Sequence, residues 1–126
     1  MEAYNRFLKY VSFPTMSDEM SETVPSTEKQ LKFGEYLTYE LKELGLDDAF
    51  MDSHGYVYAT LKKNCEKSCP TIGFIAHMDT SPAASDENIR AKIVKYTGED
   101  ILLNKDKQIY LRKCDYPYLT DYVGHD

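Results

Sequence analysis

Two segments of the chain repeat apolar residues at the spacing of an amphipathic helix. In the first, the i, i+3, i+4 and i+7 positions of the helical pattern are occupied by Tyr4, Phe7, Leu8 and Val11. Pro14 follows soon afterwards and predicts the end of this helix. The polar stretch at residues 15–26 has no periodicity and predicts a loop.

The second helical pattern begins near Thr27. Thr27 and Gln30 have the spacing of a capping box, and Gly45 is placed to end the helix in a left-handed conformation. One face of the predicted helix is apolar, with Phe33, Leu37, Leu41 and Leu44.

The remaining apolar segments are short and predict strands. Residues 49–51 and 56–61 are separated by a His54-Gly55 turn. The run TIGFIA at residues 71–76 is continuously apolar and partly β-branched, as expected of a central strand buried on both faces. Further strands are predicted at residues 91–96, 100–103 and 108–111. A helical turn is predicted at residues 117–124.

These elements together predict an α/β fold in which helices pack on a mixed sheet, with the central strand near residues 71–76. The chain has 126 residues, of which 42% are hydrophobic, and this suits a single core. Ligands of such sheets gather beyond the carboxyl ends of the strands. His77 and Asp79 follow the predicted central strand directly.

The charge balance limits the partners that the chain is expected to have. Acidic residues outnumber basic ones by 21 to 15, and no Lys/Arg-rich stripe is present, so nucleic acid is not expected. No apolar run is long enough to span a membrane, and the start of the chain does not resemble a signal peptide. Cys65, Cys69 and Cys114 form no disulfide framework and are interpreted as surface thiols, with a metal pair at Cys65 and Cys69 as the alternative. A cytoplasmic protein is expected.

His77 and Asp79 are the candidate site. In an extended backbone, residues two apart point to the same side, so imidazole and carboxylate can approach one locus. Neutral imidazole is a good zinc ligand, and a carboxylate can orient its ring. The alternative is a histidine that only caps the end of a strand, because a His-x-Asp triplet is common.

Other polar groups carry weaker hypotheses. Ser81 or Ser85 near His77 would be candidate nucleophiles, but neither lies in a G-x-S-x-G context. His54 is explained by its turn, and the pair His125 and Asp126, at the end of the sequence, is expected to be solvated.

The segment FIAHMDTSP resembles the first metal motif of the peptidase T family of tripeptide aminopeptidases. The resemblance extends, in the family's order, over RFLKYVSFPT, VPSTEKQ, ELKELGL and GYVYATL. It implies a site with two zinc ions, in which His77 is a metal ligand and Asp79 is the catalytic carboxylate that clamps a ligand imidazole. Carboxypeptidases and deacylases of the same zinc superfamily resemble these sequence motifs less closely.

The resemblance covers about the first third of such an enzyme. It implies that residues 1–126 are the N-terminal part of a catalytic domain. The bridging aspartate, the Glu-Glu pair, the other ligands and the lid domain used for dimerisation would lie outside them. Two hypotheses follow. The first is an N-terminal fragment of a zinc aminopeptidase that is inactive alone. The second is a non-catalytic interaction domain that retains the metal motif as a relic and uses exposed apolar surface for self-association or to bind a partner.

Overall fold

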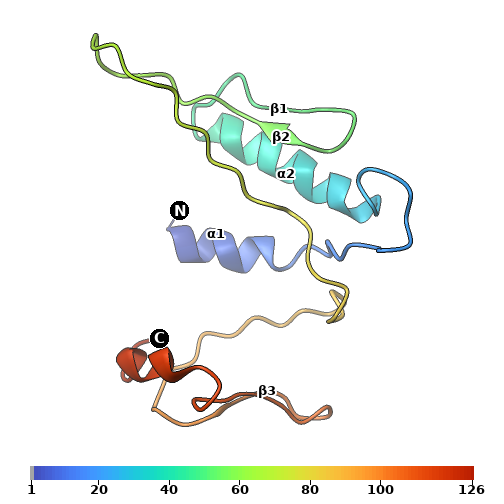
Figure 1. Ribbon diagram of the computed structural model, residues 1–126, viewed down its shortest axis with the longest axis vertical. Coiled ribbons are helices and arrows are strands. Elements are labelled where there is room, and N and C mark those ends of the chain that lie inside the picture. The colour runs from blue at the N-terminus through green and yellow to red at the C-terminus, as the bar shows by residue number, and fades with distance from the viewer. Residues whose placement is uncertain (1) are drawn as a thin grey trace. The chain divides into compact units, whose positions relative to one another are not determined.

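α1 (Ala3–Tyr10) and α2 (Lys29–Glu43) form at the two amphipathic stripes of the sequence (Figure 1). The structure is a computed structural model and describes residues 2–126. The chain divides into two units, Met1–Arg90 and Ala91–Asp126, and both α-helices lie in the first. The two predicted helices are therefore confirmed, with the first ending before Pro14 as expected.

A small aromatic cluster packs the two helices together. Phe33 of α2 is only 7% exposed, and its ring centre lies 5.4 Å from that of Tyr10 and 5.1 Å from that of Phe13. Tyr36, one turn further along α2, lies 5.0 Å from Phe13. Such edge and tilted contacts are the favoured geometries of aromatic pairs. The core of the first unit thus sits between the end of α1 and the middle of α2.

A polar contact borders this aromatic cluster. The Tyr10 hydroxyl donates a hydrogen bond to the Glu40 carboxylate, and the Tyr36 hydroxyl donates to the same group at 3.3 Å. Burial, together with the bond to Glu40, raises the pKa of Tyr10 to about 12. Both hydroxyls therefore stay protonated at neutral pH and remain donors, which links α1 to α2 through Glu40.

The two ends of α2 differ in how well the sequence predicted them. The predicted capping box does not form, because Thr27 donates its hydroxyl to the Met16 carbonyl oxygen and the Gln30 amide donates to Ser26 Oγ, both at 3.1 Å. The C-terminal end is confirmed. Gly45 has φ +88°, and its N–H and that of the next residue satisfy carbonyls of the last turn, as in a Schellman motif.

The predicted hairpin packs against α2. β1 (Phe50–Met51) and β2 (Val57–Tyr58) are antiparallel, with Phe50 opposite Tyr58 and Met51 opposite Val57. Gly55 in the turn has φ +83°, which explains the glycine. A β-carbon at Gly34 of α2 would lie 2.5 Å from Sδ of Met51, so this glycine permits the close approach of helix and hairpin.

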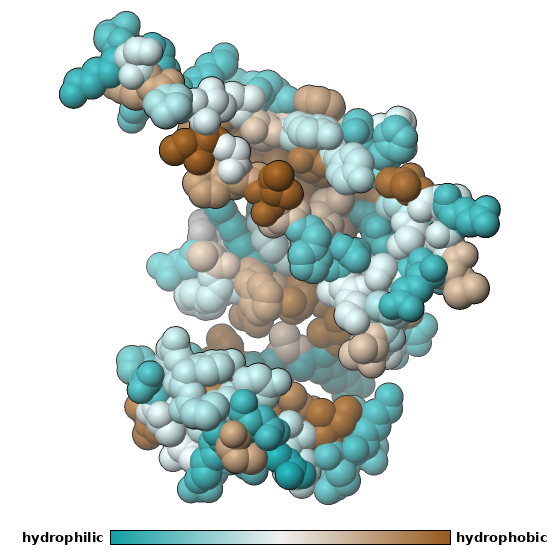
Figure 2. All heavy atoms as spheres, viewed as in Figure 1, coloured by the Kyte–Doolittle hydropathy of each residue, from teal (hydrophilic) through white to brown (hydrophobic). Residues whose placement is uncertain are grey.

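Residues 71–76 do not form the predicted central strand. They pair with no other segment of the described chain, and the exposed fractions of Ile72, Phe74 and Ile75 are 74%, 95% and 101%. Figure 1 shows this part as a drawn-out trace, and apolar side chains lie on the surface along its course in Figure 2. A strand buried on both faces needs pairing strands at its two edges and a covering layer, and residues 2–126 provide neither.

The second unit contains the other hairpin. β3 (Ile101–Asn104) and β4 (Ile109–Leu111) are antiparallel, and η1 (Pro117–Tyr122) is a 3₁₀ helix, so these three predictions are confirmed. The strand predicted at residues 91–96 is wrong. Tyr96 instead exchanges backbone hydrogen bonds of 2.8 Å with Gly124 and His125 near the end of the described chain.

Helices and short antiparallel sheets together confirm the mixed α/β class. The sheets are two separate two-stranded ladders, and one isolated parallel bridge joins Met16 to Thr80. The larger mixed sheet centred on residues 71–76 is not present in the described residues. The class was set by local patterns, whereas a sheet of several strands needs partners from distant parts of a chain.

Candidate metal site

The structure brings His77 and Asp79 together. His77 Nδ1 lies 3.1 Å from Oδ1 of Asp79 and 2.8 Å from the Asp79 carbonyl oxygen. The His77 side chain is 83% exposed and that of Asp79 42% exposed, so the pair is open to solvent. The contact that the residue spacing predicted is therefore present, although the segment is not paired in a sheet.

The two contacts of His77 define the state of its ring. A carbonyl oxygen and a carboxylate oxygen are both acceptors, so Nδ1 must carry the proton and donate it. In the neutral imidazole the lone pair then lies on Nε2, the ring atom that faces away from Asp79. A carboxylate that fixes this tautomer is the arrangement found around histidine ligands of zinc.

A short strand bridge holds the chain directly after Asp79. Thr80 N–H donates to the Thr15 carbonyl oxygen at 3.1 Å, and Ser17 N–H donates to the Thr80 carbonyl oxygen at 2.9 Å. Figure 1 shows the segment leading to Thr80 passing beside the loop that follows α1. The position of Asp79 is therefore set on one side by a backbone ladder.

A buried carboxylate that sequence reasoning missed lies close to this bridge. Asp86 is 6% exposed, and its Oδ2 accepts hydrogen bonds from Lys29 Nζ at 2.6 Å and from Met16 N–H at 2.8 Å. These bonds hold the pKa of Asp86 below its ordinary value, with the Lys29 bond as the larger cause. No local pattern marks Asp86, because its partners lie 57 and 70 residues away along the chain.

The other candidates of the sequence do not join His77. Ser81 Oγ and Ser85 Oγ accept hydrogen bonds from backbone N–H groups two residues further on, so both are engaged within their own loop. His54 lies in the β1–β2 turn and His125 near the end of the second unit, and both are exposed. The three cysteines are free and exposed.

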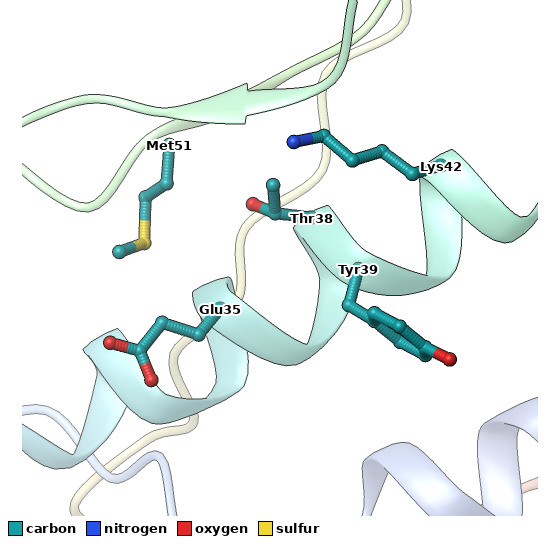
Figure 3. A pocket seen from close by; sticks show the side chains of 5 residues that line it. All are labelled: Glu35, Thr38, Tyr39, Lys42 and Met51. Atoms are coloured by element: carbon teal, nitrogen blue, oxygen red, sulfur yellow. The ribbon is translucent and has the colours of Figure 1, made fainter. Parts of the chain in front are cut away.

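A hollow between α2 and β1 is separate from His77 and Asp79. It is lined by Glu35, Thr38, Tyr39, Lys42 and Met51 (Figure 3). In Figure 3 the Glu35 carboxylate and the Lys42 amine lie at opposite ends of the hollow, and Met51 approaches from the hairpin. The hollow holds no histidine, cysteine or aspartate, and it is not part of the candidate metal site.

His77 fits the role of one zinc ligand, since a neutral, oriented imidazole with a free Nε2 is the donor that zinc prefers. Among residues 2–126, no three His, Cys, Asp or Glu side chains lie close enough together to hold a metal ion. A catalytic zinc normally takes three protein ligands. The described residues therefore bring together one candidate ligand, His77, and one carboxylate that could orient it.

Curated relatives match almost the whole chain. Peptidase T of Clostridium acetobutylicum is 56% identical over 124 residues, which are 98% of this chain and 30% of that protein. Peptidase T of Halothermothrix orenii is 53% identical over 121 residues, which cover 95% of this chain and 30% of that protein. This chain is homologous to the N-terminal part of peptidase T.

Peptidase T of Clostridium botulinum is 51% identical over 126 residues, or 99% of this chain and 31% of that protein. The chain thus spans about 30% of the length of the peptidase T relatives that it matches. No protein-family model matches the chain. The resemblance to peptidase T that the sequence motifs indicated is confirmed at the level of homology.

The described helices are all unsuited to crossing a membrane, because none in residues 2–126 is both long and apolar enough.

Proposed function

We propose that this chain supplies the N-terminal part of the catalytic domain of a zinc-dependent aminopeptidase that removes the N-terminal residue from tripeptides in the cytoplasm. The proposal rests on the His77–Asp79 contact, in which the carboxylate and the carbonyl oxygen of Asp79 fix the ring tautomer. The peptidase T relatives support the reaction class.

The two side chains have different roles in this proposal. His77 would bind one of two zinc ions through Nε2, and Asp79 would keep the Nδ1 proton in place and the ring oriented. Bound zinc would supply Lewis-acid polarisation of the scissile carbonyl and lower the pKa of a bound water. The other ligands and the general base would come from a part of the enzyme that residues 1–126 do not contain.

A chimera tests this function. The chain replaces the aligned segment of Clostridium acetobutylicum peptidase T, to which it is 56% identical, and the remainder of that protein follows unchanged. We expect the chimera to release the N-terminal residue from a tripeptide, to lose this activity on chelation and to regain it with zinc. Chromatography of the released amino acids is the measurement.

Two comparisons make this result specific. The 126-residue chain alone is expected to release no amino acid, because its described residues provide one zinc ligand. A dipeptide and a tetrapeptide, offered at equal concentration, test the preference for three residues. Release from the C-terminal end of the tripeptide, or activity that survives chelation, would contradict the proposal.

The exposed segment at residues 71–76 favours a second candidate function, that of an interaction domain which binds a second copy of itself. The segment contains no charged residue, and Phe74 and Ile75 are almost fully exposed. Identical apolar segments with unpaired backbone readily pair as strands.

Sedimentation velocity over a range of concentrations tests this self-association. We expect the 126-residue chain to form dimers or larger species, and Phe74→Ser to shift it towards the monomer. Phe7→Ser, which removes an exposed phenylalanine from α1, is the matched control. A wild-type chain that stays monomeric at every concentration would exclude the self-association proposal.

A further inference from the structure

Asp86 is the buried carboxylate of the first unit, and its surroundings need an explanation beyond local folding. Its side chain is 3% exposed and that of Lys29 is 32% exposed. Burying a charge is costly unless it is paired and hydrogen-bonded, and Asp86 meets both conditions through Lys29 and Met16 N–H. Such an arrangement holds the groups that it joins in fixed positions.

The position of Lys29 in α2 is unfavourable without an anionic partner, and Asp86 is that partner. Lys29 is the first residue of α2, and a cation at a helix N-terminus opposes the helix dipole. The first turn of α2 contains no acidic residue, and Glu28 at the N-cap makes no side-chain capping bond, whereas the Asp86 carboxylate reaches Lys29 directly. The ion pair therefore offsets an unfavourable lysine and attaches the segment containing Asp86 to α2.

The hydrogen bonds of residues 15–17 alternate in the manner of a β-strand. Thr15 and Ser17 both bond to Thr80: the Thr15 carbonyl oxygen accepts from Thr80 N–H, and Ser17 N–H donates to the Thr80 carbonyl oxygen. Met16 faces the other way: its N–H donates to Asp86 and its carbonyl oxygen accepts the Thr27 hydroxyl at 3.1 Å. The short strand is thus held between Thr80 on one side and the start of α2 on the other.

This series of contacts ends at the candidate zinc ligand. Asp86 fixes Met16, the neighbours of Met16 fix Thr80, and Thr80 follows Asp79 directly. Asp79 accepts the Nδ1 proton of His77 through two oxygens, one on its side chain and one on its backbone. A change in the backbone at Thr80 therefore moves both acceptors relative to the ring.

We propose that Asp86, paired with Lys29, is a positioning residue for the metal ligand: by anchoring Met16 it holds Asp79 where it keeps His77 protonated on Nδ1 and leaves Nε2 for zinc. The inference rests on the proposed function for its biological meaning. Its structural content, the link between Asp86 and the tautomer of His77, can be tested without any metal.

The test uses nitrogen NMR of the 126-residue chain. The chain has three histidines, so His54→Gln and His125→Gln leave His77 as the single imidazole to be labelled with ¹⁵N. At about pH 8.5 a free imidazole is neutral, and the ¹⁵N shifts report which ring nitrogen carries the proton. We expect the Nδ1–H form to dominate in this background.

Three substitutions in the same background separate the interactions. In Asp86→Ala the ratio of Nδ1–H to Nε2–H is expected to fall by about fivefold, the effect of one net hydrogen bond. Asp86→Asn keeps an oxygen acceptor for Met16 N–H but loses the ion pair with Lys29, and it should restore part of the ratio. Glu87→Ala removes the adjacent, exposed carboxylate and should leave the ratio unchanged.

A tautomer ratio that does not change in a folded Asp86→Ala chain would overturn the inference. If that variant does not fold, as shown by circular dichroism, Lys29→Met decides: it removes the partner that holds Asp86 beside Met16, so a smaller fall in the ratio is expected, and an unchanged ratio would overturn the inference. In the chimera, Asp86→Ala should weaken zinc binding, while Glu87→Ala should not. If the chimera has no peptidase activity but Asp86→Ala still lowers the tautomer ratio in the 126-residue chain, the proposed function is refuted and the positioning role of Asp86 stands.

Discussion

Replacing His77 by alanine in the chimera is expected to lower kcat/KM for tripeptide hydrolysis by about a thousandfold or more, since the change removes the proposed metal ligand. Asp79→Asn keeps the size of the side chain but replaces the carboxylate, and we expect a smaller loss of about 10- to 100-fold. Zinc content, measured on the purified variants, should fall in His77→Ala. Steady-state kinetics with one tripeptide provides the comparison.

His54→Ala is the matched control for His77→Ala. His54 is also an exposed histidine, but it lies in the β1–β2 turn, where its backbone N–H donates to Oδ1 of Asp52 at 2.9 Å. Its substitution keeps that backbone bond and should leave both zinc content and turnover unchanged. Wild-type turnover in His77→Ala would refute the metal assignment, and an equal loss in His54→Ala would show a general effect on folding.

Phe33→Ala is expected to destabilise the 126-residue chain by about 3–5 kcal/mol, the usual effect of removing a buried phenylalanine. Phe33 is 7% exposed and contacts the rings of Tyr10 and Phe13, so its loss opens the contact between α1 and α2. Few other large side chains are buried in the first unit. Urea unfolding followed by circular dichroism should show the helical signal lost at a much lower midpoint, or absent without urea.

Phe7→Ala provides the control for Phe33→Ala. Phe7 lies on α1 and is 63% exposed, so the same substitution removes little buried surface. Surface substitutions of this kind usually change stability by about 0.5 kcal/mol or less. Similar midpoints for Phe33→Ala and Phe7→Ala would show that the aromatic contact between α1 and α2 does not hold the first unit together.

The elements that the sequence predicted correctly depend on near neighbours. The periodic apolar residues of α1 and α2 lie three or four positions apart, and Gly45 and Gly55 supply the positive φ angles that end a helix and close a turn. The contact between His77 and Asp79 is equally local, because only Met78 lies between them in the sequence. The chemical role proposed for this contact is supported by homology to peptidase T.

The failures involve partners that are distant in sequence. The capping box at Thr27 is not formed because the Met16 carbonyl oxygen, eleven residues earlier, takes the hydroxyl. In the segment 91–96, which forms no strand, Tyr96 bonds to Gly124 and His125. In both cases the local pattern identified residues that form hydrogen bonds, but it did not identify the groups with which they form them.

The sequence by itself determined the helices, the turns, the hairpins and the His77-x-Asp79 motif, because each depends on backbone preferences and side-chain spacing within a few residues. Only the tertiary structure decided that residues 71–76 are exposed and that Asp86 is buried against Lys29 and Met16. Burial and strand pairing depend on which distant groups are close in space. An apolar run or a single aspartate carries no information on those partners.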